Sequence, residues 1–207
     1  MSHELLSGTT EQHLLQSVVA VARHVYAAAA SSIFMVSPDT GDLVFAAVAG
    51  AGEQSLVGRR FPAGTGIAGW VTMSCQTLIV DNVAETDHFA RDAATSTGYL
   101  PSSIMAAPLI AGNTCIGVLE VLDRHATEPD RELDDLELLD LLATQAAVSL
   151  SLVRHRERRV ETHEWGGLLA RLSDLAVAQT PDPLAVELLS VCLHLLQRTT
   201  AEHSLAR

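Results

Sequence analysis

Near the start of the chain, apolar residues recur every three or four positions, which places them on one face of an α-helix and predicts a helix over residues 11–28. The two segments that follow, 32–37 and 43–49, are apolar and rich in residues that favour β-strands. Between them lies 38–42, where proline, aspartate and glycine suit a tight turn. The pattern therefore predicts a helix followed by a β-hairpin.

A second group of elements follows a glycine-rich stretch. The pattern predicts one short helix, three strands and a long polar connection. In chain order these are the helix 67–74, the strand 77–80, the connection 83–101 and the strands 104–110 and 114–122. The last two strands are apolar almost throughout, which predicts a hairpin at the centre of a sheet covered on both faces.

The pattern over residues 131–158 predicts a long helix with two apolar faces. On one face, the apolar residues are spaced alternately three and four apart, as in a coiled-coil seam, and are predicted to form a homodimer interface. They are Leu136, Leu139, Ala143, Ala146, Leu150 and Val153. Other apolar residues, Leu138 and Leu141 among them, lie off this seam. Such a helix needs two partners, which we expect to be the domain's own sheet and a second copy of the chain.

In the last part of the chain, residues 159–207, the apolar pattern predicts further helices on both sides of a break at 181–183. There, two prolines flank an aspartate. We interpret this part as a helical hairpin or a signalling-helix extension. The predicted organisation is therefore an N-terminal tail over 1–10, a domain over 11–158 and a helical extension over 159–207.

Charge and composition narrow the range of functions. The formal net charge is -12, and all 13 basic residues are arginines, which argues against nucleic-acid binding because phosphate contacts need clustered cations. Chemistry that requires a lysine is excluded. No apolar run reaches the ~18 residues of a membrane-spanning helix, and no signal peptide is apparent, so we expect a cytoplasmic protein without membrane contact.

Five local motifs occur in a characteristic order along this pattern. They are GTGIAGWV at 64–71, LIVDNV at 78–83, MAAPLI at 105–110, IGVLEV at 116–121 and DLELL with the following LA and QAA at 135–147. With the order of helices and strands, these motifs make the chain similar to the GAF domain family. The resemblance implies an α+β fold with a central antiparallel sheet, terminal helices on one face and a small-molecule pocket on the other.

The resemblance also implies where a ligand would bind. Candidate pocket residues come from the short helix and its entry, from the next strand, and from the long connection and its exit. They are Phe61, Ile67, Trp70, Val71, Ile79, Asp81, Phe89, Tyr99 and Met105. Core packing is an equally good explanation of the apolar ones. Trp70 and Tyr99 are favoured because each has an apolar face and one polar group.

Specific cofactors of GAF domains find little support. In the cyclic-nucleotide signature, Asp123-Arg124 replaces Asn-Lys and the Phe is missing, although Arg124 and Asp135 can still form an ion pair. Cys75 has no neighbouring histidine for bilin attachment, and His88 is the one histidine of the connection that could ligate heme. Methionine-sulfoxide reductases of this family need cysteines around the pocket loop, and 83–101 contains none.

The sequence therefore assigns no cofactor and no catalytic or metal-binding residues. The three cysteines are widely spaced among apolar neighbours, which indicates buried thiols rather than a disulfide or zinc site. We expect a non-catalytic GAF sensor module that dimerises through its terminal helices and relays small-molecule binding or contact with a separate output protein. The alternatives are a ligand-free structural adaptor and, more remotely, a free methionine-sulfoxide reductase.

Overall fold

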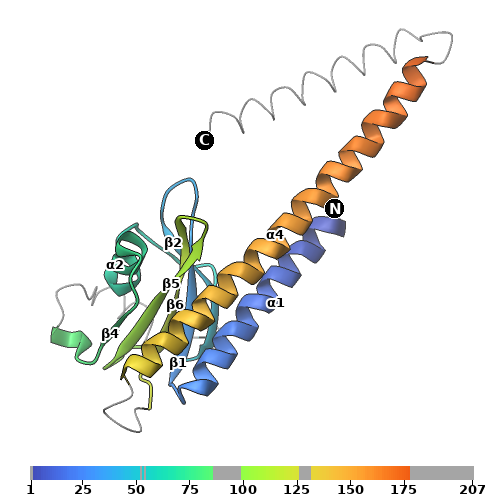
Figure 1. Ribbon diagram of the computed structural model, residues 1–207. Coiled ribbons are helices and arrows are strands. Elements are labelled where there is room, and N and C mark those ends of the chain that lie inside the picture. Colours follow the sequence, from blue (N-terminus) through green and yellow to red (C-terminus); the bar gives the residue numbers. More distant parts are fainter. Residues whose placement is uncertain (1, 52, 54, 86–98, 126–131, 178–207) are drawn as a thin grey trace. The chain divides into compact units, whose positions relative to one another are not determined.

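The computed structural model describes all residues except 1, 52, 54, 86–98, 126–131 and 178–207 (Figure 1). The chain forms two compact units, Met1–Arg154 and His155–Arg207. The first unit contains the sheet and every site discussed below. In the second, the described residues continue a helix that begins in the first.

A six-stranded antiparallel sheet forms the centre of the first unit. In chain order its strands are β1 (Ala30–Val36), β2 (Leu43–Gly50), β3 (Arg60–Phe61), β4 (Leu78–Val80), β5 (Ile104–Ala111) and β6 (Thr114–Leu122). They lie in the order β3-β2-β1-β6-β5-β4, so the first and last long strands are paired at the centre. The predicted α+β fold with a central antiparallel sheet is confirmed. The two-residue strand β3 was not predicted.

Within the described residues, three α-helices and one short 3-10 helix accompany the sheet. They are α1 (Ser2–Val25), α2 (Gly66–Ser74), η1 (Val83–Glu85) and α4 (Glu132–Val177). The first helix is longer than predicted, because α1 begins at Ser2 rather than near residue 11. The predicted end of the long helix near residue 158 is also wrong, since α4 continues to Val177. The predicted break at 181–183 lies outside the described residues.

The helices lie on opposite faces of the sheet, and the alternation of side chains along each strand builds two separate cores. Ile33 and Leu119 pack on the face that α1 and α4 cover. Their neighbours Phe34 and Val118 pack on the face that carries α2. Figure 1 shows α1 and α4 running side by side along one face, with α2 on the other. The terminal helices therefore do not contact the face on which a ligand would bind.

Gly117 allows the two central strands to approach each other closely. A Cβ atom at this position would lie 2.4 Å from the carbonyl oxygen of Phe34 on β1. The two residues lie next to each other across the β1–β6 ladder, where Phe34 pairs with Val118 and Met35 with Gly117. Glycine is the one residue that fits without moving the backbone.

The predicted dimer interface is corrected by the structure. Leu139, Ala143, Ala146 and Leu150 have between 0% and 1% of their surface exposed and belong to the core between α4, α1 and the sheet. They cannot meet a second chain without unfolding the domain. The remaining predicted interface residues, Leu136 and Val153, are half-buried.

The opposite face of α4 is the exposed one. It carries Leu138, Leu141, Val148 and Leu152, whose side chains are 38%, 55%, 50% and 64% exposed. With Gln145, which is also exposed, these positions are spaced three, four, three and four residues apart. We call this set the exposed stripe of α4. The helix has the two apolar faces that the sequence predicted, but the sheet covers the one we assigned to the dimer.

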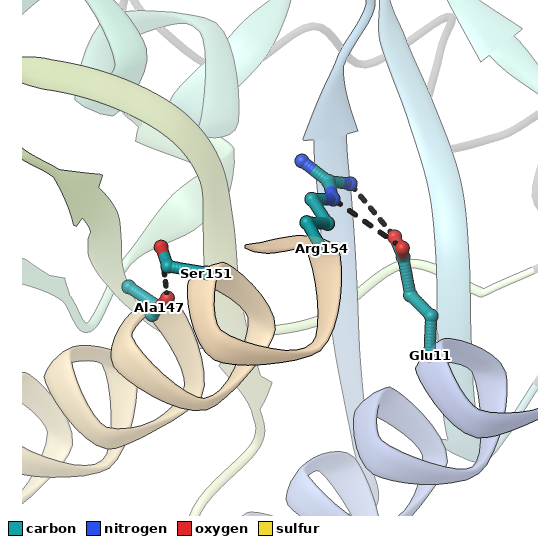
Figure 2. A network of polar contacts seen from close by, with 4 residues as sticks. All are labelled: Glu11, Ala147, Ser151 and Arg154. Atoms are coloured by element: carbon teal, nitrogen blue, oxygen red, sulfur yellow. Dashed lines mark hydrogen bonds and ion pairs between the residues drawn. The ribbon is translucent and has the colours of Figure 1, made fainter. Parts of the chain in front are cut away.

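An ion pair joins α1 to α4 within the first unit (Figure 2). The Arg154 guanidinium donates to both carboxylate oxygens of Glu11, at 2.7 and 3.3 Å. One turn earlier, the Ser151 hydroxyl donates to the carbonyl of Ala147 at 2.8 Å within the helix. Both partners of the ion pair are partly exposed, so it orients the helices more than it stabilises them.

Part of α4, Leu133–Arg156, is long and apolar enough to cross a membrane by length and composition. Core helices pass the same test, and one face of this helix is buried in the domain core. We expected no such segment from the sequence, because no apolar run reaches the ~18 residues of a membrane-spanning helix. The segment is apolar enough on average because it carries apolar residues on two faces rather than one.

Candidate functional site

A cavity of about 100 Å³ lies on the α2 face of the sheet. It is bounded by β1, β2, β3, the start of β5 and the end of β6, by the first turn of α2, and by the segment that leads into β5. Among the described residues its lining is mostly apolar. The polar side chains that line it are Ser32, Thr65, Tyr99 and Glu120.

Three phenylalanine rings form one wall of the cavity. Phe34 and Phe45, on paired strands, have their ring centroids 4.0 Å apart. Phe61 from β3 meets both rings edge-on, with centroids 6.4 and 5.8 Å away. Edge-to-face contacts of this kind hold aromatic rings in place. The cavity therefore has a fixed aromatic wall.

Glu120 is the one acidic side chain among the described residues that line the cavity. It lies in β6 opposite Ser32 of β1 and Ala106 of β5, with 7% of its surface exposed. Burial raises the pKa of its carboxyl group to about 7, and the hydrogen bond from Ser32 opposes this shift. That hydrogen bond is long, at 3.5 Å. A buried carboxyl group with so weak a partner is costly to retain for stability alone.

The rim of the cavity is tied to the end of β6 by Asp123. The Tyr99 hydroxyl donates to one oxygen of the Asp123 carboxylate. The other oxygen accepts the backbone N–H groups of Ser102 and Ser103, at 2.7 and 2.9 Å. Burial, together with the Asp123 carboxylate, raises the Tyr99 pKa to about 12. Tyr99 therefore presents its ring to the cavity while its hydroxyl remains bound to Asp123.

The next residue, Arg124, connects this rim to both terminal helices. Its guanidinium forms an ion pair with Asp135 in the first turn of α4, which is the pair that the sequence allowed. The backbone carbonyl of Asp135 accepts the hydroxyl of Tyr26, just after α1, at 2.8 Å. Burial and the Asp135 carboxylate raise the pKa of Tyr26, and Arg124 lowers it. The first turn of α4 and the residue that follows α1 thus meet near the end of β6.

The predicted ligand residues divide into three groups. Phe61, Ile67 and Tyr99 line the cavity. Ile79 and Met105 are paired across β4 and β5 and pack on the opposite face with α1 and α4, so their assignment to the pocket is wrong.

The remaining predictions lie apart from the cavity or outside the described residues. Val71 is fully buried in the core beneath α2, Trp70 packs partly buried against that core, and Asp81 is exposed. They are absent from the described lining of the cavity. Phe89 falls within 86–98 and cannot be placed.

Sequence reasoning missed Glu120, although the sequence contains a signal for it. It is the one charged residue within a strand that is otherwise mainly apolar. The alternation of a strand places it on the same face as Val118 and Leu122. Phe34 and Phe45 were missed because ordinary core packing explains a phenylalanine in a buried strand equally well.

Comparison with known protein families shows which family this chain belongs to. The model of the GAF domain family matches residues 10–150, which is more than half of the chain. The chain belongs to the GAF domain family. GAF domains are in general regulatory modules that sense small molecules, and the cavity lies on the sheet face where the resemblance placed a ligand pocket.

Proteins named as cyclic-nucleotide phosphodiesterases are among the relatives of this GAF domain. A probable 3',5'-cyclic phosphodiesterase of Caenorhabditis elegans is 30% identical over 86 residues, covering 42% of this chain and 11% of that protein. The cone cGMP-specific 3',5'-cyclic phosphodiesterase subunit alpha' of Mus musculus is 29% identical over 92 residues, covering 44% and 11%. The chain thus spans about a tenth of the length of the curated relatives it matches.

Solved structures give the same fold at lower identity. The GAF-B domain of DevS from Mycobacterium smegmatis superposes with a TM-score of 0.58 at 21% identity, covering 72% of this chain and 98% of that one. The free methionine-R-sulfoxide reductase from Neisseria meningitidis, in complex with its substrate, gives a TM-score of 0.57 at 23% identity, covering 69% and 78%. At this identity the likeness establishes the fold alone.

The cysteines of this GAF domain are placed differently from our expectation. Cys75 follows α2 and is exposed, and Cys115 at the start of β6 is half-buried, so the expectation that both are fully buried is wrong. Burial raises the pKa of the Cys115 thiol, and the neighbouring Cys75 thiol adds to the effect. Neither lines the cavity. Cys192 and His88 lie outside the described residues.

Proposed function

We propose that this chain is a non-catalytic GAF regulatory module whose cavity binds a small molecule and whose terminal helices relay the binding state. The observation that carries the proposal is the chain of bonds from the cavity rim to the helices. Tyr99 lines the cavity and is bonded to Asp123, and the adjacent Arg124 is paired with Asp135 of α4. A ligand that moves Tyr99 therefore acts on the first turn of α4.

This relay needs a helix arrangement with two states, because a ligand shifts an equilibrium only by its difference in affinity for those states. Arg124 is suited to couple the sheet to the helices, since its side chain is 6% exposed and its charge is met by a helix residue. Breaking a buried ion pair is strongly destabilising, so the sheet end and the helix start move together.

The second state involves another copy of the chain, which we place on the exposed stripe of α4. Leu138, Leu141, Val148 and Leu152 repeat at the spacing of a coiled-coil seam, and two identical helices fit such a seam. The stripe lies on the opposite side of the helix from the buried residues Leu139, Ala143, Ala146 and Leu150, so dimerisation leaves the domain core intact. A separate output protein is the further partner we propose for the relay.

A charge on the exposed stripe tests this dimer. The double substitution Leu141→Glu and Leu152→Glu should give a folded monomer in sedimentation equilibrium, while the wild type is a dimer. Met73→Glu is the matched control, because Met73 is 72% exposed on α2 and the dimer should persist. Leu139→Glu should unfold the domain instead. A monomeric wild type, or a double variant that stays dimeric, would refute dimerisation through the exposed stripe.

The relay is tested by linking binding to dimerisation. We would screen small anionic, neutral and cationic compounds by ligand-observed NMR, and measure the dimer dissociation constant with each binder present. A binder should shift that constant for the wild type, and Tyr99→Phe should bind it with the shift reduced. If no compound binds at millimolar concentrations and the dimer persists, the ligand-free structural adaptor is the better function. A binder without any shift refutes the relay.

The activities named for the relatives are not proposed for this chain. The phosphodiesterases match over about a tenth of their length, and a cyclic nucleotide carries a phosphate anion. Among the described cavity residues, none is basic and one is a glutamate. A sulfoxide reductase needs a nucleophilic thiolate, but neither Cys75 nor Cys115 lines the described cavity.

A further inference from the structure

The charge distribution of the cavity points to a class of ligand, on the basis that the cavity is the ligand site proposed above. Among the described lining residues, the titratable side chains are those of Glu120 and Tyr99. The Tyr99 hydroxyl donates a hydrogen bond to Asp123, and the Thr65 hydroxyl donates one to the carbonyl of Pro62 at 2.6 Å. Among the described polar groups of the cavity, the Glu120 carboxylate is thus the one with the most remaining capacity to accept hydrogen bonds.

Glu120 retains capacity for a strong donor. An ionised carboxylate accepts from about four directions, and the Ser32 hydroxyl occupies one of them at 3.5 Å. Among the described residues, the strands paired with Glu120 bring no cation to it: β1 has Ser32 and β5 has Ala106 at the paired positions. Within the same part of the chain, burial raises the Glu120 pKa and the Ser32 hydroxyl lowers it.

The aromatic wall adds a second preference of the same sign. The faces of phenylalanine rings are electron-rich and attract cations, most strongly where water is excluded. Phe34, Phe45 and Phe61 line the same cavity as Glu120. The carboxylate favours a positive group and repels an anion, and any ring that turns its face to the cavity adds to that preference.

We propose that the cavity binds a small organic cation, a primary ammonium or amidinium compound, with its charged group on the Glu120 carboxylate and its hydrocarbon part against the three phenylalanine rings. The size follows from the volume of about 100 Å³. An engineered apolar cavity of roughly 150 Å³ holds one benzene molecule, so the hydrocarbon part of the ligand is at most about one small ring, and a short branched chain fits the volume better.

Binding should depend on pH in a defined direction. The cation binds the ionised form of Glu120, and in the empty protein this carboxyl group has a pKa of about 7. Below that pH a ligand must displace a proton. As the pH increases towards the pKa of Glu120, the affinity should therefore rise by up to about tenfold per pH unit. Above that pKa the affinity should become constant.

Matched probes of different charge test this assignment. Benzylamine, benzyl alcohol and benzoate share one ring, and isobutylamine, isobutanol and isobutyrate share a smaller chain. Each would be titrated into the wild-type chain, Glu120→Gln and Glu137→Gln by calorimetry or ligand-observed NMR. Glu137 is exposed on α4 and serves as the control for removal of a carboxylate.

The proposal expects one of the amines to bind the wild type and Glu137→Gln on the order of tenfold or more tighter than its alcohol, with the carboxylates weakest. Glu120→Gln should lose that preference while binding the alcohol as before. Alcohols or carboxylates that bind as tightly as the amines overturn the charge assignment and leave the proposed function standing. If no probe of any charge binds at millimolar concentrations, both are overturned.

Discussion

Replacing Glu120 by glutamine isolates the effect of a buried ionisable group on stability. Burial raises the pKa of this carboxyl group from 4.5 to about 7 in the folded protein. Between these pH values the folded state holds a proton that the unfolded chain has released. The stability due to that proton is fully present below the unfolded pKa and is lost as the pH rises through the folded pKa.

The size of the effect follows from the two pKa values. Each pH unit is worth ~1.4 kcal/mol, so the interval from 4.5 to about 7 corresponds to about 3 kcal/mol of unfolding free energy. Solvent screening reduces this little, because the Glu120 side chain is buried. Glutamine does not titrate. Relative to the wild type, Glu120→Gln should therefore gain about 3 kcal/mol between about pH 4.5 and pH 8.

Urea denaturation followed by circular dichroism, at one protein concentration and at several pH values, measures this difference. The control Glu137→Gln changes an exposed carboxylate of α4 and should run parallel to the wild type. The other ionisable groups are common to the proteins compared, so their contributions cancel in the comparison. Parallel curves for the wild type and Glu120→Gln would refute the account of a buried, poorly paired carboxyl group.

Three further substitutions test the packing. Gly117→Ala places a Cβ atom 2.4 Å from the carbonyl oxygen of Phe34, so urea denaturation should show a loss of about 2 kcal/mol or more. Phe45→Ala removes one ring of the aromatic wall and should cost about 3–5 kcal/mol in the same assay, with an enlarged cavity. Arg154→Ala breaks the partly exposed pair with Glu11 and should cost less than about 1 kcal/mol, with a loss smaller still at high salt.

Much of the fold could be predicted from the sequence, because local patterns carry the information that local structure needs. The nearly continuous apolar pattern of 104–110 and 114–122 predicted the central hairpin, and β5 and β6 form it. Gly117 lies within an apolar strand, where a glycine favours close approach of another backbone, and Phe34 supplies that backbone. The order of motifs identified the GAF family, whose model covers residues 10–150. These features depend on residues near one another in the chain, or on a pattern that many sequences share.

The tertiary structure alone decided which apolar face of α4 meets the sheet. Leu139 and Leu141 are equally apolar and both belong to a three-four repeat, so periodicity ranks them equally. One is fully buried and the other is 55% exposed, because the sheet can cover only one face. The same holds for Met105 and Glu120. A strand's alternation separates its two faces but does not say which one the terminal helices cover. That choice depends on contacts between segments a hundred residues apart, and it places Met105 in the helix core and Glu120 in the cavity.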